Sequence, residues 1–173
     1  MRIIVPRYAV LLTVLPGTLA GCAGASLEGE PVTREVRVSV AQAVRAADAV
    51  FGQQGIPVQE SDEAGGHLRS GIFDPRSRWG ALTDGRITCG ADETGLDRVH
   101  AARTVEVELR MEVRRIRGAR GAGAEPRGTE VSIWGSGWAN VDGSEHPCGV
   151  RADYRAELVQ AIVERAERRS AVF

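Results

Sequence analysis

The chain has 173 residues, of which 43% are hydrophobic and 26% are charged, and its formal net charge at pH 7 is −1. This length and composition suit one globular domain with a hydrophobic core of its own. A net charge so close to zero creates no strong field, so we expect no nucleic-acid partner and no binding of anionic lipid by charge. Every basic side chain apart from histidine is an arginine, which we attribute to a GC-rich genome.

The first residues have the pattern of a secretory signal. Arg2 and Arg7 are basic, and an apolar run extends from Tyr8 to Leu15. A basic start, a short apolar run and small residues before a cleavage site define such a signal. The run is too short to cross a bilayer, which takes about 20 apolar residues. We therefore expect residues 1–21 to be a signal peptide that is removed.

The signal ends in Leu19-Ala20-Gly21-Cys22. This order, placed after an apolar run, resembles the lipobox of bacterial lipoproteins. The resemblance implies that the Cys22 thiol is diacylated and that cleavage makes Cys22 the mature N-terminus, with its new amine also acylated. Several acyl chains suffice for stable anchoring, since each buried CH₂ contributes about 0.8 kcal/mol. The alternative is an ordinary signal peptide with a chance cysteine.

The resemblance also bears on location. Ala23 stands where an aspartate retains many such lipoproteins in the inner membrane, so it favours the outer membrane, facing the periplasm. Residues 22–34 are small, polar and turn-rich, and we expect them to form a lipidated flexible tether. The remaining residues, 35–173, should form one domain. Because the signal carries two arginines and no acid, its removal changes the formal net charge from −1 to −3.

The domain should begin with a strand followed by a helix. Valines alternate with polar residues over positions 36–40, which indicates a brief strand. Ser39 and Gln42 have the spacing of a capping box, so a helix should start there. Gly52 or Gly55 can end this helix. One continuous helix from residue 35 is the alternative.

Short elements should follow. We expect a second strand from Ile56 to Val58, a turn over 61–66 and a returning strand over 67–73. Residues 74–85 contain Pro75 and suggest a loop that holds Trp79. Residues 86–89 are β-prone and short.

Residues 104–114 give the clearest strand. Apolar residues at every second position face a fully charged side, which predicts one packed face and one solvated face; they are Val105, Val107, Leu109, Met111 and Val113. The Gly/Ala-rich segment from Gly118 to Gly128 suggests the tip of a long hairpin, which we favour over an arginine-glycine RNA-binding segment.

Residues 129–141 should form the return strand. Val131 and Ile133 would join the core face, which places Trp134 and Trp138 on the opposite face. Exposed aromatic side chains of this size are typical of a binding surface. The alternatives are that a loop covers the tryptophans, or that a bulge at the neighbouring glycines reverses the pattern.

The last element should be a helix that begins shortly after Cys148. Asp153 is a candidate N-cap residue. Glu164 and Arg168 have the spacing of an i,i+4 ion pair. Arginines gather near the helix C-terminus, as the helix dipole favours.

The three cysteines are Cys22, in the lipobox-like segment, and Cys89 and Cys148, in the predicted domain. If Cys22 carries lipid, Cys89 and Cys148 remain in an oxidising compartment where disulfides persist. We expect them to form a disulfide. The alternative is a zinc site formed by both cysteines with His100 and His146, but His146-Pro147-Cys148 lacks a usual zinc spacing. We therefore expect no metal.

The chain offers little for catalysis, and we predict no catalytic residue and no cofactor. Gly135-Ser136-Gly137 lacks the spacing and the strand-to-helix elbow of a serine nucleophile. His67, His100 and His146 have no nucleophile or metal-ligand motif near them in the sequence. Neither a P-loop nor a dinucleotide-binding fingerprint occurs.

The element order β-α-β-β-β-β-β-α predicts an α+β fold, a two-layer sandwich with two helices on one face of a mainly antiparallel sheet. The order resembles the small helix-on-sheet domains of envelope-assembly lipoproteins of the BamC type, and next those of the LptE type. The matching features are a strand, a helix ending near Gly55-Ile56-Pro57-Val58, a hairpin with Gly65-Gly66, and Cys148-Gly149-Val150 leading into the final helix. They span most of the mature chain and include no diagnostic motif.

Two functions are consistent with these expectations. The first is a non-enzymatic, lipid-anchored accessory protein that binds another envelope component through the Trp134/Trp138 face or a free sheet edge. The second is a small-molecule or lipid carrier with a pocket between the helices and the sheet.

Overall fold

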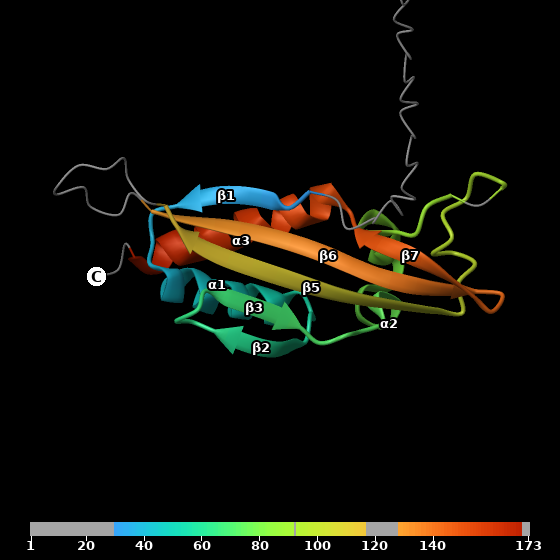
Figure 1. The fold of residues 1–173 in the computed structure, drawn as a ribbon, viewed down its shortest axis with the longest axis horizontal. Coiled ribbons are helices and arrows are strands. Elements are labelled where there is room, and N and C mark those ends of the chain that lie inside the picture. Colours follow the sequence, from blue (N-terminus) through green and yellow to red (C-terminus); the bar gives the residue numbers. More distant parts are fainter. Residues whose placement is uncertain (1–29, 92, 117–127, 171–173) are drawn as a thin grey trace, which may run out of the picture.

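The computed structural model describes residues 30–91, 93–116 and 128–170 (Figure 1). Within them the chain forms one seven-stranded antiparallel sheet with helices packed on it, so the expected α+β two-layer sandwich is confirmed. None of the described helices combines the length and apolar character of a bilayer-spanning segment. The elements are β1 (Val32–Val36), α1 (Val40–Gln53), β2 (Val58–Asp62), β3 (His67–Ser70), α2 (Pro75–Trp79), the 3₁₀ helix η1 (Gly80–Gly85), β4 (Ile87–Thr88), β5 (Thr104–Arg115), β6 (Thr129–Val141), β7 (Ser144–Val150) and α3 (Ala152–Ser170).

The sheet is built around the long strand β6. Its strand order is β2-β3-β5-β6-β7-β4, with β1 paired to β6 outside this path. On one side β6 pairs with β5 along its whole length. On its other side β1 pairs with residues 129–133 and β7 with residues 136–141, so these two strands follow one another along the same edge.

The β5–β6 hairpin carries the centre of the core. Its register pairs Thr104 with Asn140 and Arg115 with Thr129, and the inward residues of β5 alternate with exposed or half-buried ones. All five predicted core positions are buried: Val105, Val107, Leu109, Met111 and Val113. The strand prediction is therefore confirmed. The predicted hairpin tip, Gly118–Gly128, lies outside the described residues except for Gly128.

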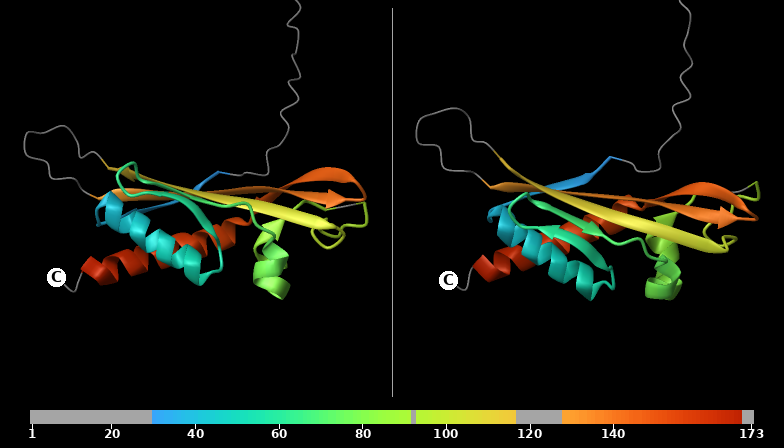
Figure 2. Two further views of the ribbon diagram at one scale, coloured as in Figure 1. Left: turned by 90° about the horizontal axis from the view of Figure 1, so that it is seen from below. Right: turned by 60° about the horizontal axis from the view of Figure 1, so that its bottom comes forward.

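Helices α1 and α3 cover one face of the sheet, and α2 lies on the same side (Figure 2). Helix α1 has the predicted capping box, in which Ser39 and Gln42 satisfy each other's backbone groups. It ends at Gln53, and Gly55 adopts φ +71°, a conformation that L side chains rarely adopt. Its small buried residues let it lie close to α3 and the sheet; they are Ala43, Ala46 and Ala47.

The first strand lies earlier than the valine pattern predicts. Val36, Val38 and Val40 are all buried, yet they lie at the end of β1, in the connection and at the start of α1. Thr129 Oγ1 donates to the Val38 carbonyl at 3.0 Å, which anchors the connection. The strand prediction over 36–40 is therefore wrong, because three different environments bury the valines. Strand β1 also includes residues 32–34, so the predicted tether over 22–34 is wrong at its C-terminal end.

Two elements are not evident from the sequence. Residues 75–79 form helix α2 where a loop was predicted, because the Asp74 carboxylate accepts from the Arg76 N–H and Pro75 occupies the first turn. Residues 144–150 form β7, which adds a strand before the last helix. Helix α3 begins at Ala152, so Asp153 lies within its first turn and is not the N-cap. The predicted Glu164–Arg168 ion pair is present, with 3.6 Å between nitrogen and oxygen.

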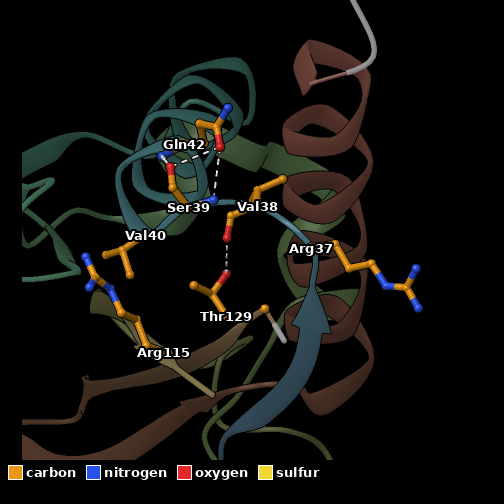
Figure 3. A pocket seen from close by; sticks show the side chains of 8 residues that line it. Arg37, Val38, Ser39, Val40, Gln42, Arg115 and Thr129 are labelled. Carbon is orange, nitrogen blue, oxygen red and sulfur yellow. Dashed lines mark hydrogen bonds between the residues drawn. The ribbon is translucent and has the colours of Figure 1, made fainter. Parts of the chain in front are cut away.

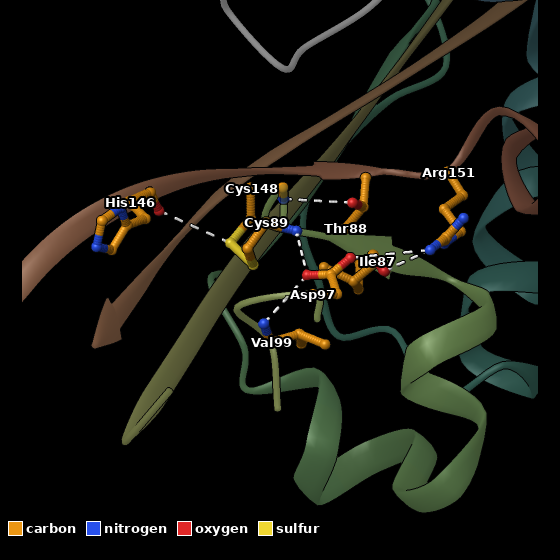
Figure 4. Close-up of a disulfide and its surroundings, with 9 residues drawn as sticks. Ile87, Thr88, Cys89, Asp97, Val99, His146, Cys148 and Arg151 are labelled. Atoms are coloured by element: carbon orange, nitrogen blue, oxygen red, sulfur yellow. Dashed lines mark hydrogen bonds and ion pairs between the residues drawn. A yellow bond between two sulfur atoms is a disulfide. The ribbon is translucent and has the colours of Figure 1, made fainter. Parts of the chain in front are cut away.

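The disulfide between Cys89 and Cys148 is confirmed and joins the end of β4 to β7 (Figure 4). Because both sulfur atoms are bonded to each other, neither is a thiolate that could bind zinc. Asp97 fastens the same region, since its Oδ1 accepts from the N–H groups of Cys89 (2.9 Å) and Val99 (3.1 Å). Burial raises the Asp97 pKa, but these hydrogen bonds, one from Thr88 and the charge of Arg151 outweigh it, so the pKa lies below its ordinary value.

Candidate functional site

The sheet has one face that no described helix covers. Figure 2 shows α1, α2 and α3 together on one side of the sheet, with the opposite face open. Side chains on β5 and β6 alternate between the two faces. The inward residues form the core, and every second residue of β6 from Ser132 to Asn140 is directed to the open face.

Trp138 is the most prominent side chain on this open face. It is 57% exposed, although tryptophan is usually well buried. The register places it opposite Glu106 on β5 and opposite Pro147 on β7. Residues directly opposite one another on antiparallel strands have their side chains on one face. The indole therefore lies between a carboxylate on one side and a proline ring on the other.

Trp134 lies on the same face, two repeats of the alternation away. It is half-buried and opposite Arg110 on β5. Ser136 separates the two tryptophans, opposite Glu108 and Gly149. We call Trp134, Ser136 and Trp138 the tryptophan row. Four residues of strand separate its two indoles by about 13 Å, with only small side chains between them on β6 and β7.

The glycines on either side of Ser136 explain how the row is positioned. A β carbon at Gly135 would overlap the Val150 side chain, and one at Gly137 would overlap the Glu106 carbonyl oxygen. The core side of β6 therefore accepts no side chain at these two positions, and neighbouring strands pack closely there. This close packing holds the backbone of the row against Val150 and the backbone of β5.

The charges beside the row largely neutralise one another. Glu108 accepts from Arg69 at 3.2 Å and from Arg110 at 3.0 Å, and its side chain is only 16% exposed. Further along, Arg114 donates to Glu112 at 2.8 Å. Glu106, opposite Trp138, forms no ion pair with any described residue. The row thus combines an exposed indole with one unpaired carboxylate on a surface of mostly paired charges.

A cavity of about 590 Å³ lies elsewhere, between the β1–α1 connection and the start of β6 (Figure 3). Its polar groups already have partners, because Ser39 and Gln42 bond to each other and Thr129 bonds to Val38. Arg37 and Arg115 point away from these groups in Figure 3. The cavity therefore contains no group poised for chemistry.

The side chains that could act in catalysis or bind a metal lie far from one another in the sequence and do not form a cluster among the described residues. His67 lies on the surface, 3.2 Å from Glu60, and no group of three or more potential metal ligands occurs among the described residues. Burial raises the Tyr154 pKa to about 12, with a smaller opposite effect of Arg86 and a small further rise from Glu157. Its ring packs edge-on against Trp79, and the Arg86 guanidinium lies 4.4 Å from the tyrosine ring centre. This cluster is part of the core.

The sequence identified the two tryptophans but missed their neighbours. Pro147 and Glu106 flank Trp138 only because β7 and β5 pair with β6 in one register. The Trp138–Pro147 pairing requires strand β7, which is not evident from the sequence. Comparison with protein-family models finds no match, and comparison with curated protein sequences finds none either.

Proposed function

We propose that the chain is a lipid-anchored, non-enzymatic accessory protein of the bacterial cell envelope, and that it binds another envelope component through the tryptophan row. The observation that supports this proposal is the exposure of Trp138 on an open sheet face. A tryptophan buries about 150–250 Å² when it is covered, and residues of this type dominate the energy of many interfaces. Leaving it in water is costly unless a partner covers it.

The anchor is part of the proposal. The lipobox-like Leu19-Ala20-Gly21-Cys22 would give Cys22 its acyl chains and place the domain at the outer membrane, facing the periplasm. A domain held at a membrane by lipid meets its partner at a high effective concentration. A modest binding surface is therefore sufficient, and the proposal requires no catalytic group or cofactor.

The carrier alternative has less support. A carrier needs a continuous apolar cavity between the helices and the sheet. In the described residues, large side chains from both layers fill that space, and all of them are less than 2% exposed: Phe51, Leu109, Ile133, Leu158 and Ile162. No observation favours this second function, so we do not develop it.

The test compares full-length variants in the cell of origin. Replacing Trp134 and Trp138 together with alanine should abolish recovery of the partner that co-purifies with the wild-type protein. Replacing Leu82, which is 59% exposed on η1, should leave that recovery unchanged. Retention of every partner in the double variant would contradict the proposed surface. In parallel, Cys22→Ala should abolish metabolic labelling with a fatty acid and release the protein from membranes.

A further inference from the structure

A second candidate surface is the free edge of β1, beside α3. Strand β1 pairs with β6 on one side and, among the described residues, with no strand on its other side. Alternate N–H and C=O groups of such an edge strand point outward without a partner strand. Helix α3 runs beside β1, as the red-brown helix and the blue strand of Figure 3 show. Edge and helix together form a groove.

The groove consists of two successive hollows. One, of about 440 Å³, lies between Arg34 of β1 and the face of α3 that includes Glu157 and Gln160. The next, of about 600 Å³, continues along Glu35, Arg37 and Glu167. Arg34 donates to Gln160 at 2.7 Å, which ties strand and helix together across the groove floor.

The charge of the groove is unbalanced. Its lining contains five carboxylates and two arginines, namely Glu35, Asp153, Glu157, Glu164, Glu167, Arg34 and Arg37. Four of the carboxylates, those of Glu35, Asp153, Glu157 and Glu167, form no ion pair with any described residue, whereas Glu164 pairs with Arg168. On the open sheet face, by contrast, Glu108 and Glu112 pair with arginines, although Glu106 does not. This excess of negative charge favours a basic ligand.

The other long edge of the sheet lacks these features. Strand β2 has a register irregularity between Val58 and Glu60, which interrupts pairing along that edge. The Glu60 carboxylate there is already paired with His67 and Arg69. By contrast, β1 keeps an unbroken register over all five of its residues. The β1 edge is therefore the one suited to an added strand.

We propose that the β1–α3 groove binds an extended basic peptide segment, which adds to β1 as a further strand. Main-chain hydrogen bonds to β1 would supply the affinity, and alternate side chains would supply the specificity. Residues of one parity lie about 7 Å apart along an extended peptide. On α3 the carboxylates recur every one to two turns, about 5–10 Å apart. The long side chains of arginine or lysine at every second peptide position can therefore reach them. The proposal does not depend on the function of the tryptophan row.

The test uses the full chain in detergent micelles and an acetylated octapeptide of alternating arginine and threonine. We expect the peptide to bind, and the backbone amides of Thr33 and Glu35 to exchange more slowly in its presence. The same peptide with glutamate in place of arginine should not bind. In an added strand, every second backbone N–H of the peptide faces β1. Methylation of these nitrogens should abolish binding, whereas methylation of the nitrogens that face away from β1 should not.

Two matched double variants test the role of charge. Glu157→Gln with Glu167→Gln should weaken peptide binding by about two- to twentyfold, as expected for two partly exposed ion pairs. Glu106→Gln with Glu145→Gln removes the same charge from the open face and should leave binding unchanged. The proposal is wrong if the basic peptide does not bind, if the acidic peptide binds equally well, or if protection appears at β2. Concentration-dependent protection of β1 without peptide would assign the groove to a second copy of the chain and would also overturn it.

Discussion

The two tryptophans at positions 79 and 138 allow one substitution to be compared in opposite environments. Trp79 is 6% exposed, its ring packs edge-on against Phe73 and Tyr154, and its Nε1 donates to the Gln54 carbonyl at 2.9 Å. Trp79→Ala removes all of these contacts. Loss of a buried tryptophan costs about 3–5 kcal/mol in the free energy of unfolding. Trp138 is 57% exposed, so Trp138→Ala should change that free energy by less than about 1 kcal/mol.

Urea denaturation measures both changes. With a denaturant slope of about 2 kcal/mol/M, Trp79→Ala should lower the midpoint by about 2 M, and Trp138→Ala by less than about 0.5 M. The slope itself should stay constant in both variants if unfolding remains two-state. Equal destabilisation by the two substitutions would refute the reasoning, because it would mean that the fold depends on Trp138 as much as on Trp79. The tryptophan row would then be a structural feature.

Three further predictions concern the disulfide and two perturbed side chains. Replacing both Cys89 and Cys148 with alanine should lower the free energy of unfolding by about 4 kcal/mol, because the disulfide joins residues 59 positions apart. A reductant should destabilise the wild type but not this double variant. No effect of the reductant on the wild type would contradict the prediction. The lowered pKa of Asp97 stabilises the fold above the unfolded pKa of about 3.9, and this contribution is lost as the pH falls through the lower folded value. The stability advantage of the wild type over Asp97→Asn, measured by urea denaturation, should therefore be present at neutral pH and shrink below about pH 4, and an advantage that grows on acidification would be inconsistent with it. Ultraviolet titration should give a Tyr154 pKa of about 12. The free energy of unfolding should fall once the pH exceeds about 10, because the phenol ionises first in the unfolded chain. A Tyr154→Phe variant identifies the tyrosine signal, and an ordinary tyrosine pKa in the folded protein would contradict the prediction.

Elements with strong local signals could be predicted from the sequence. The alternation in β5 is regular because, from Val105 to Arg114, every residue of one face is apolar core and every residue of the other is charged. The Ser39–Gln42 capping box is a local interaction that spans three residues, so it needs no tertiary information. The disulfide could be predicted because Cys22, in the lipobox-like segment, was set aside and left Cys89 and Cys148 as a pair. In each case a few neighbouring residues, or the number of cysteines, are enough to predict the feature.

The missed elements depend on distant partners or on weak signals. Strand β7 has Pro147 at its centre, which argues against a strand, but the residue lies opposite Trp138 and is exposed. Helix α2 has only five residues, and its Asp74-Pro75 start is equally typical of a turn. The position of β1 is determined by pairing with residues almost a hundred positions later, so local alternation placed it a few residues too late.

The candidate surfaces divide in the same way. The exposure of Trp138 follows from the alternation of β6, but its neighbours Glu106 and Pro147 follow only from the register of three strands. The β1–α3 groove could not be predicted, because it requires both the true position of β1 and the face of α3 that lies beside it. Sequence patterns thus identified single residues, and topology identified the surfaces.

Site-specific photocrosslinking in intact cells tests the central claim most directly. A photoreactive residue would replace Trp138 in one full-length protein and Leu82, which is almost equally exposed, in another. Binding through the tryptophan row predicts a discrete crosslinked product from position 138 and none from position 82. The absence of any product from position 138, or the same product from both positions, would contradict it.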